Sequence, residues 1–185
     1  MGFIDSGLMA AYIPLSIRHD LIFSRWGAGL AIAPGVAVTN DHNSNLIPPD
    51  RLLARSRDYD LLFFRTDSEI ASPTGEARLG EDVIAYGQGR AEALREASGR
   101  VTALGETLPP RCQDCARQRA LVFDADAGEG FSGGPVADAK TGAVLGIVFG
   151  YLDLPGAGGG RRMYAYDIGL VMDEMRRLVK PPAAR

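Results

Sequence analysis

From Trp26 onward, the apolar residues of the chain occur in short runs, and each run is bounded by Gly, Pro, Asn or Asp. Such runs between turn-forming residues are typical of β-strands joined by tight turns. Because helical periodicity is scarce here, we expect an all-β fold. The pattern predicts strands over residues 29–33, 36–40, 52–55, 59–66, 83–87, 100–104, 120–124, 135–138, 143–151 and 163–167.

Two segments depart from the strand pattern. Residues 90–97 are compatible with one short helix. Near the C-terminus, residues 168–178 carry apolar side chains at a helical spacing, which predicts an amphipathic helix with one face on the core. The apolar face consists of Ile168, Val171, Met172, Met175 and Leu178.

The segment SPTG at residues 72–75 is the best candidate for a linker, because it separates two sets of predicted strands. It divides the chain into an N-terminal lobe over residues 1–74 and a C-terminal lobe over residues 75–185, which includes the terminal helix. Short antiparallel strands of this kind can close into small barrels. We therefore expect two β-barrel lobes.

The composition is that of an ordinary folded domain, with 46% hydrophobic and 23% charged residues. The formal net charge of −3 predicts no general attraction to nucleic acid or to an anionic membrane. No apolar run reaches the roughly 18 residues that a membrane helix needs, and Asp5, Pro14 and Arg18 interrupt any signal-peptide pattern. A cytoplasmic location is the default expectation.

The segment GEGFSGGPV at residues 128–136 places Ser132 among Gly130, Gly133 and Gly134. Glycine permits positive φ and close backbone approach, so such a turn can direct its own N–H groups at a point beside the serine oxygen. An oxyanion hole needs this arrangement, with the N–H groups of Gly130 and Ser132 as donors. The alternative is a glycine-rich hairpin turn that carries an incidental serine.

A serine nucleophile requires a base, and the chain contains two histidines, His19 and His42. His42 follows the apolar strand predicted over residues 36–40, so it lies at a strand end and outside the core. His19 lies between Arg18 and Asp20, which is the setting of a solvated surface residue. We therefore predict His42 as the general base.

The third group of such a site is a carboxylate that orients the imidazole and stabilises its cation. Asp60 stands at the head of the apolar run 61–64, which can bury the surroundings of the acid and hold it in place. Asp58, on the same strand face, is the alternative acid. Asp41 is adjacent to His42 and cannot easily fold back onto its ring. Asp60 could also be a simple strand cap.

Taken in order, five segments resemble the trypsin-like (chymotrypsin-fold) serine peptidases, especially the compact bacterial members: GAGLAIAPGVAVTNDH, DYDLLFFR, LGEDVIAYGQG, GEGFSGGPV and AVLGIVFG. The resemblance extends over residues 27–178 and implies two six-stranded antiparallel β-barrels with the site in the cleft between them. It makes His42 the general base, Asp60 its orienting acid and Ser132 the nucleophile. The amides of Gly130 and Ser132 would form the oxyanion hole.

Two positions depart from the family pattern. The residue before His42 is usually alanine and here is Asp41, and the residue before the nucleophile is usually Asp or Asn and here is Phe131. Activation by a new N-terminus that pairs with that acid is therefore not expected. The spacing between His42 and Asp60 is also shorter than in most relatives, which implies trimmed loops.

The resemblance also assigns residues to the pocket that receives the substrate side chain before the scissile bond. Asp126 would lie at the pocket floor and favour cleavage after Arg or Lys. Phe149, Gly150 and Tyr151 fall along the pocket wall, where a bulky Tyr151 would shorten the pocket. The alternative for Asp126 is a polar loop residue without a role in binding.

Cys112 and Cys115 form a C-x-x-C pair. Tetrahedral zinc would need two further ligands, and no second pair is present. A thioredoxin-type site would place the first cysteine at a helix N-terminus after a strand, whereas Pro109 and Pro110 precede this pair. We expect a loop pair that is reduced in a cytosol or closed as a small ring in an oxidising compartment.

The resemblance implies a serine endopeptidase that acts on protein or peptide substrates without a metal or cofactor. Residues 130–134 also fit the G-x-S-x-G motif of α/β-hydrolase esterases, but that fold places its histidine after the serine and no histidine follows position 42. A catalytically inactive peptidase-fold protein that binds peptides or a partner is the remaining alternative, because of Asp41 and Phe131. The sequence does not predict an oligomeric state.

Overall fold

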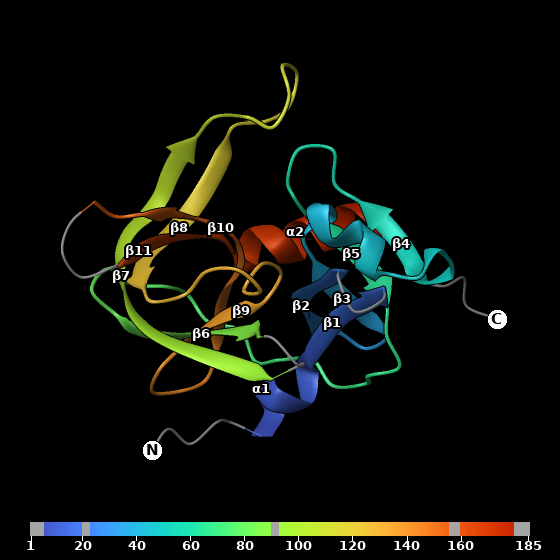
Figure 1. Ribbon diagram of the computed structural model, residues 1–185. Coiled ribbons are helices and arrows are strands. Elements are labelled where there is room, and N and C mark those ends of the chain that lie inside the picture. Colours follow the sequence, from blue (N-terminus) through green and yellow to red (C-terminus); the bar gives the residue numbers. More distant parts are fainter. Residues whose placement is uncertain (1–5, 20–22, 90–92, 156–159, 180–185) are drawn as a thin grey trace.

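The structure, a computed structural model, describes residues 6–19, 23–89, 93–155 and 160–179 (Figure 1). Strands dominate it, and the two α-helices lie at the beginning and the end of the described residues. The elements are α1 (Ser6–Ala11), β1 (Tyr12–His19), β2 (Phe23–Ala33), β3 (Val36–Thr39), the 3-10 helices η1 (Asp41–Leu46) and η2 (Pro49–Arg51), β4 (Leu52–Arg55), β5 (Leu62–Arg65), β6 (Asp82–Gln88), β7 (Leu94–Leu108), β8 (Gln118–Ala125), β9 (Pro135–Asp138), β10 (Val144–Asp153), β11 (Arg161–Asp167) and α2 (Ile168–Leu178).

The first lobe is an antiparallel sheet of five strands in the order β1-β2-β3-β5-β4. The prediction of a six-stranded barrel here was wrong, because β1 and β4 remain edge strands. The chain after β5 adds no strand to this lobe, and Thr74 instead forms an isolated bridge with Val144 of β10. Gly75 N donates to Val144 O (2.9 Å) and Val144 N donates to Pro73 O (2.8 Å), so this segment follows the other lobe.

The second lobe is a closed barrel in which the strands follow the order β10-β11-β8-β7-β6-β9. Every neighbouring pair is antiparallel. Its interior is filled by alternating inward side chains, among them Val101, Leu121, Phe123, Phe131 and Leu145. Closure leaves no open edge in this lobe, in contrast to the first.

The short helix predicted over residues 90–97 was wrong for the part that the structure describes. Residues 90–92 lie outside the described residues, and β7 begins at Leu94. Ala97 pairs with Ala85 of β6 and is buried, so pairing across the hairpin overrides the local helical pattern. The strand Tyr12–His19 was not predicted either, although it pairs along its length with β2.

Helix α2 begins and ends where the sequence predicts. Asp167 caps its start by accepting a hydrogen bond from Gly169 N (2.8 Å). Ile168 and Val171 are buried on its inner face. Ser56 of the first lobe donates to Glu174 Oε1 (2.6 Å), so the helix ties the C-terminal part of the chain to the first sheet.

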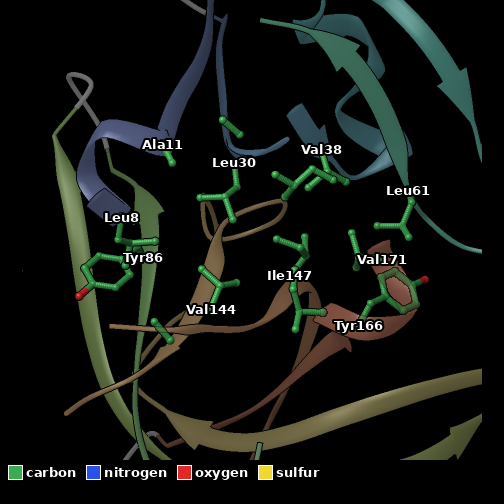
Figure 2. Close-up of a cluster of buried hydrophobic side chains, with 14 of the residues drawn as sticks. Leu8, Ala11, Leu30, Val38, Leu61, Tyr86, Val144, Ile147, Tyr166 and Val171 are labelled. Atoms are coloured by element: carbon green, nitrogen blue, oxygen red, sulfur yellow. The ribbon is translucent and has the colours of Figure 1, made fainter. Parts of the chain in front are cut away.

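A shared hydrophobic cluster joins the two lobes (Figure 2). Leu30, Val38 and Leu61 reach it from the first lobe, and Ile147 and Tyr166 reach it from the barrel. Figure 2 shows these side chains converging on one space between the lobes. The lobes therefore meet across a packed core, which holds the groups along their boundary in a defined relation.

Candidate active site

A cleft of about 580 Å³ lies along the boundary between the lobes. It brings the predicted base and nucleophile to one surface, His42 from η1 and Ser132 from the loop between β8 and β9. The lining residues are Arg25, Trp26, His42, Asn43, Asn45, Leu46, Glu129, Gly130, Ser132 and Tyr151.

His42 contacts Asp60 through two hydrogen bonds. Its ring Nδ1 lies 2.6 Å from Asp60 Oδ2, and its backbone N–H donates to Asp60 Oδ1 (3.1 Å). An ionised carboxylate only accepts, so in the neutral ring Nδ1 carries the proton and Nε2 has a free lone pair. The side chain of His42 is 47% exposed and that of Asp60 14%, so the acid is covered while the base faces solvent.

The environment of Asp60 keeps it charged. Burial opposes ionisation, but it is outweighed by the hydrogen bonds from the His42 ring and backbone, the charge of the imidazolium when the ring is protonated, and the charge of Arg111. Together they hold the pKa of Asp60 below its usual value. Arg111 Nη2 lies 3.5 Å from Asp60 Oδ1. The acid can therefore orient and stabilise the imidazole as a carboxylate.

The backbone of Asp60 is held from both sides. Asp60 N donates to Tyr166 Oη (2.9 Å), and Tyr166 Oη in turn donates to Gln118 Oε1 (2.6 Å). Asn40 Nδ2 donates to Asp60 O (2.9 Å). The sequence predicts a strand over residues 59–66, but β5 begins at Leu62, so Asp60 precedes the strand and is not part of it. It is therefore positioned by side chains of both lobes.

Asp58, the alternative acid, takes part in a different set of contacts. Its Oδ1 accepts from Ala116 N (3.1 Å), and its carbonyl oxygen accepts from Gln118 Nε2 (2.8 Å). Of the two carboxylates, Asp60 is the one that contacts His42. Asp41 pairs with Arg55 (3.2 Å) and Arg111 (3.5 Å), away from the neighbouring imidazole.

The loop that carries Ser132 is packed against both lobes and requires its glycines. Gly130 (φ +88°) and Gly133 (φ +84°) adopt left-handed conformations. A Cβ at Gly130 would come within 1.8 Å of Gln88 O, and one at Gly133 within 2.1 Å of Ala28 O. No other residue type fits these two positions without moving the backbone of β2 or β6.

The backbone of Ser132 is anchored to the first lobe. Its carbonyl oxygen accepts from Ala28 N (3.1 Å) and from Asn43 Nδ2 (3.0 Å). Asn43 also donates to Thr39 Oγ1 (3.1 Å), which donates to Ala28 O (2.7 Å). Asn43 directly follows His42, so one hydrogen-bonded network links η1 to the loop that carries Ser132.

The groups that would react are left unpaired within the described part of the chain. The amides of Gly130 and Ser132 donate to no other described group, whereas those of Phe131, Gly133 and Gly134 are used inside the fold. Ser132 Oγ makes no hydrogen bond with a described residue, so none joins it to the His42 ring. Two amides and a hydroxyl remain available at the cleft.

Phe131, which departs from the family pattern, is fully buried in the barrel core. A Cβ added to Gly87 would come within 2.5 Å of its ring, so β6 passes directly against it. The Arg95 guanidinium lies 5.3 Å from the ring centroid on another side. The loop that carries Ser132 is therefore packed into the barrel core through the side chain that precedes the serine.

The residues assigned to substrate binding separate in the structure. Tyr151 lines the cleft, and Arg161 stacks on its ring at 4.9 Å. Phe149 stacks on Tyr166 (4.2 Å between centroids), and Gly150 lies at a bulge in the pairing of β10 with β11. Asp126 is exposed and is not among the residues that line the cleft.

Several residues of this site were not predicted from the sequence. Trp26, Asn43 and Glu129 line the cleft, and Tyr166 and Gln118 support the acid from behind. The adjacency of Asn43 to His42 is the one signal that could have indicated it. Glu129 lies within the glycine-rich segment 128–136. Trp26, Tyr166 and Gln118 come from distant strands and carry no local pattern.

The cysteine pair and His19 are the remaining candidate features of the sequence. Cys112 and Cys115 form a disulfide. The side chain of His19 lies outside the described residues. In the described ranges, no group of three His, Cys, Asp or Glu is arranged to hold a metal ion. No described helix has the length and apolar character needed to cross a membrane.

Several solved structures share this fold. The HtrA-type protease AlgW with a tripeptide matches with a TM-score of 0.71 and 20% identity, covering 95% of this chain and 62% of AlgW, so this chain spans less than two thirds of its length. The active form of the Rv3671c protease from M. tuberculosis matches with a TM-score of 0.75, 16% identity and coverages of 99% and 87%. The MamO protease domain from Magnetospirillum magneticum matches with a TM-score of 0.65, 15% identity and coverages of 91% and 97%.

The sequence itself gives a second comparison. No curated protein matches the chain. The family model of the trypsin-like peptidase domain, however, matches residues 27–147, which is more than half of the chain and includes His42, Asp60 and Ser132. The chain therefore belongs to the trypsin-like peptidase family.

Proposed function

We propose that this protein is a serine endopeptidase that hydrolyses peptide bonds through His42, Asp60 and Ser132. The observation that carries the proposal is the 2.6 Å contact between His42 Nδ1 and Asp60 Oδ2, in a cleft that Ser132 also lines. Family membership supports a peptidase, and AlgW, which shares the fold, is a protease whose structure holds a tripeptide. The substrates are accordingly proteins or peptides.

The chemistry is an acyl transfer in two steps. His42 Nε2 takes the hydroxyl proton of Ser132, and Ser132 Oγ attacks the substrate carbonyl carbon. The oxyanion accepts hydrogen bonds from Gly130 N and Ser132 N, each of which is worth about a hundredfold to a thousandfold in rate in comparable sites. His42 then gives its proton to the leaving amine, and the C–N bond breaks.

Water completes the reaction. His42 takes a proton from a water molecule, the resulting hydroxide attacks the acyl ester, and the proton returns to Ser132 Oγ as the acid product leaves. Throughout, the charge on Asp60 stabilises the imidazolium that forms twice in the cycle. Ser132 Oγ must turn toward His42 for the first transfer, and no hydrogen bond with a described residue holds it elsewhere.

The alternative function is a peptidase fold that binds peptides or a partner protein without cleaving them. The lack of a hydrogen bond between the Ser132 hydroxyl and the His42 imidazole favours this binding function. The two functions share the fold and the cleft. They differ in whether Ser132 behaves as a nucleophile.

A fluorophosphonate probe followed by intact-mass measurement tests the proposal. We expect one adduct on the wild-type chain, none on Ser132→Ala, and an unchanged adduct on Ser98→Ala, which alters an exposed serine of β7. Ser132→Ala should fold normally and lose all peptide turnover. A folded wild-type chain that never acquires the adduct would leave the binding module as the better function.

A further inference from the structure

The tip of the β7–β8 hairpin, residues 109–117, crosses from the barrel to the first lobe. In Figure 1 the hairpin projects from the barrel, and its tip lies beyond the ends of both strands. Ala116 N donates to Asp58 Oδ1 (3.1 Å), and Arg111 Nη1 donates to Tyr59 O (2.6 Å). The tip thus contacts the segment that leads directly into Asp60.

Arg111 is the residue of this tip that reaches the acid. Its Nη2 lies 3.5 Å from Asp60 Oδ1, the oxygen that accepts from His42 N, and 3.5 Å from Asp41 Oδ2. The side chain is 34% exposed, and its bond to Tyr59 O fixes its direction. Arg111 therefore contacts the carboxylate oxygen of Asp60 that the imidazole ring does not contact.

The tip is closed covalently next to Arg111. Cys112 and Cys115 form a disulfide, and Cys115 N donates to Cys112 O (3.1 Å), so the residues after Arg111 form a tight ring. Cys115 Sγ also lies 3.3 Å from Arg57 O of the first lobe. A closed ring limits the conformations of a tip that would otherwise be free to move.

We propose that Arg111 is a positioning residue for Asp60, and that the disulfide-closed tip holds Arg111 in place. The inference rests on the proposed function. Arg111 touches neither the cleft nor the reacting atoms. It holds one carboxylate oxygen by charge, so that the other oxygen stays directed at His42 Nδ1. The barrel would in this way set the geometry of the acid in the opposite lobe.

Other charged or titratable groups surround this contact. Asp41 forms ion pairs with both Arg111 and Arg55, and Asp58 and Tyr59 directly precede Asp60 in the sequence. Tyr166 faces Asp60 from β11. Because Asp41 is a second carboxylate in contact with the same guanidinium, the experiment must separate an effect through Asp60 from one through Asp41.

The first measurement is peptide turnover by Arg111→Met. We expect kcat to fall about fivefold with KM unchanged, which is the effect expected when one partly exposed ion pair to a single catalytic group is lost. Arg111→Lys, which keeps the charge, should recover part of the loss. Arg117→Met is the matched control, since Arg117 is an exposed residue of the same tip that forms no ion pair with a described residue.

The second measurement is a double-mutant cycle on the rate of fluorophosphonate labelling, which stays measurable when turnover is slow. In an Asp60→Asn background, Arg111→Met should have no further effect, because the group through which it acts is gone. In an Asp41→Asn background its effect should persist. An equal loss with and without Asp60, or a loss that vanishes with Asp41→Asn, overturns the inference.

The third measurement opens the ring. Cys112→Ser/Cys115→Ser should lower kcat by no more than Arg111→Met does, and should add nothing to Arg111→Met. A loss that is additive to Arg111→Met would show that the ring does not act through Arg111. A wild-type chain that neither labels nor turns over would remove the proposed function and this inference together, whereas an active wild type with a fully active Arg111→Met removes this inference alone.

Discussion

Phe131→Ala tests whether hydrophobic packing holds the nucleophile loop. The ring is fully buried, and the backbone of β6 runs against it at Gly87, so the barrel cannot collapse into the space that the substitution leaves. Loss of a buried Phe in such a site costs about 3–5 kcal/mol of unfolding free energy. For a chain of this size, that corresponds to a fall in Tm of roughly 10 °C.

The effect should also reach the chemistry. Gly130 and Ser132 flank Phe131, and Phe131 itself donates to Gly128 O (3.2 Å) and accepts from Gly134 N (2.9 Å). A loosened turn would spread the positions of the two amides proposed as oxyanion donors. Labelling of Ser132 by fluorophosphonate should therefore slow at temperatures where the variant is still folded.

Urea unfolding of three variants, each compared with the wild type, provides the assay. Leu79→Ala, at a leucine that is 69% exposed, should change the free energy of unfolding by less than about 0.5 kcal/mol. Phe131→Leu, which fills most of the space, should cost about 1 kcal/mol. If Phe131→Ala costs no more than Leu79→Ala, the loop is held by its hydrogen bonds and the packing argument is wrong.

Three further predictions concern carboxylates. Asp60→Asn should reduce kcat by about four orders of magnitude, because an amide favours the wrong imidazole tautomer; a crippling effect of Asp58→Asn, with Asp60→Asn mild, would show that the acid is misassigned. The pKa of the Asp60 carboxyl is lower in the folded state than its unfolded value of about 3.9. The stability that this shift contributes is present above the unfolded pKa and is lost as the pH falls through the folded pKa. Wild type and Asp60→Asn should therefore converge in unfolding free energy at acidic pH. A difference that persists at the lowest pH would contradict this linkage. Asp126→Asn should leave cleavage preference in a peptide library nearly unchanged, because Asp126 lies outside the cleft lining and its charge acts on Arg161; a lost preference for Arg or Lys would place Asp126 in the pocket.

Local sequence determined the elements whose signals are local. The apolar spacing of residues 168–178 predicts α2 with its observed bounds, and the runs 52–55 and 135–138 predict β4 and β9. The glycines around Ser132 predict a turn with positive φ, because only glycine adopts it without strain. In each case the sequence signal lies within a few neighbouring residues.

Tertiary structure decided the rest. Residues 94–97 form a strand because β6 pairs with them. The first lobe stays open because no strand follows β5 in its sheet, and residues 73–75 pair with β10 of the barrel. Asp60, and not Asp58, contacts His42 because Tyr166 and Asn40 hold its backbone from opposite sides. Such contacts join residues far apart in the chain, and their strength depends on burial and direction, which a one-dimensional pattern does not contain.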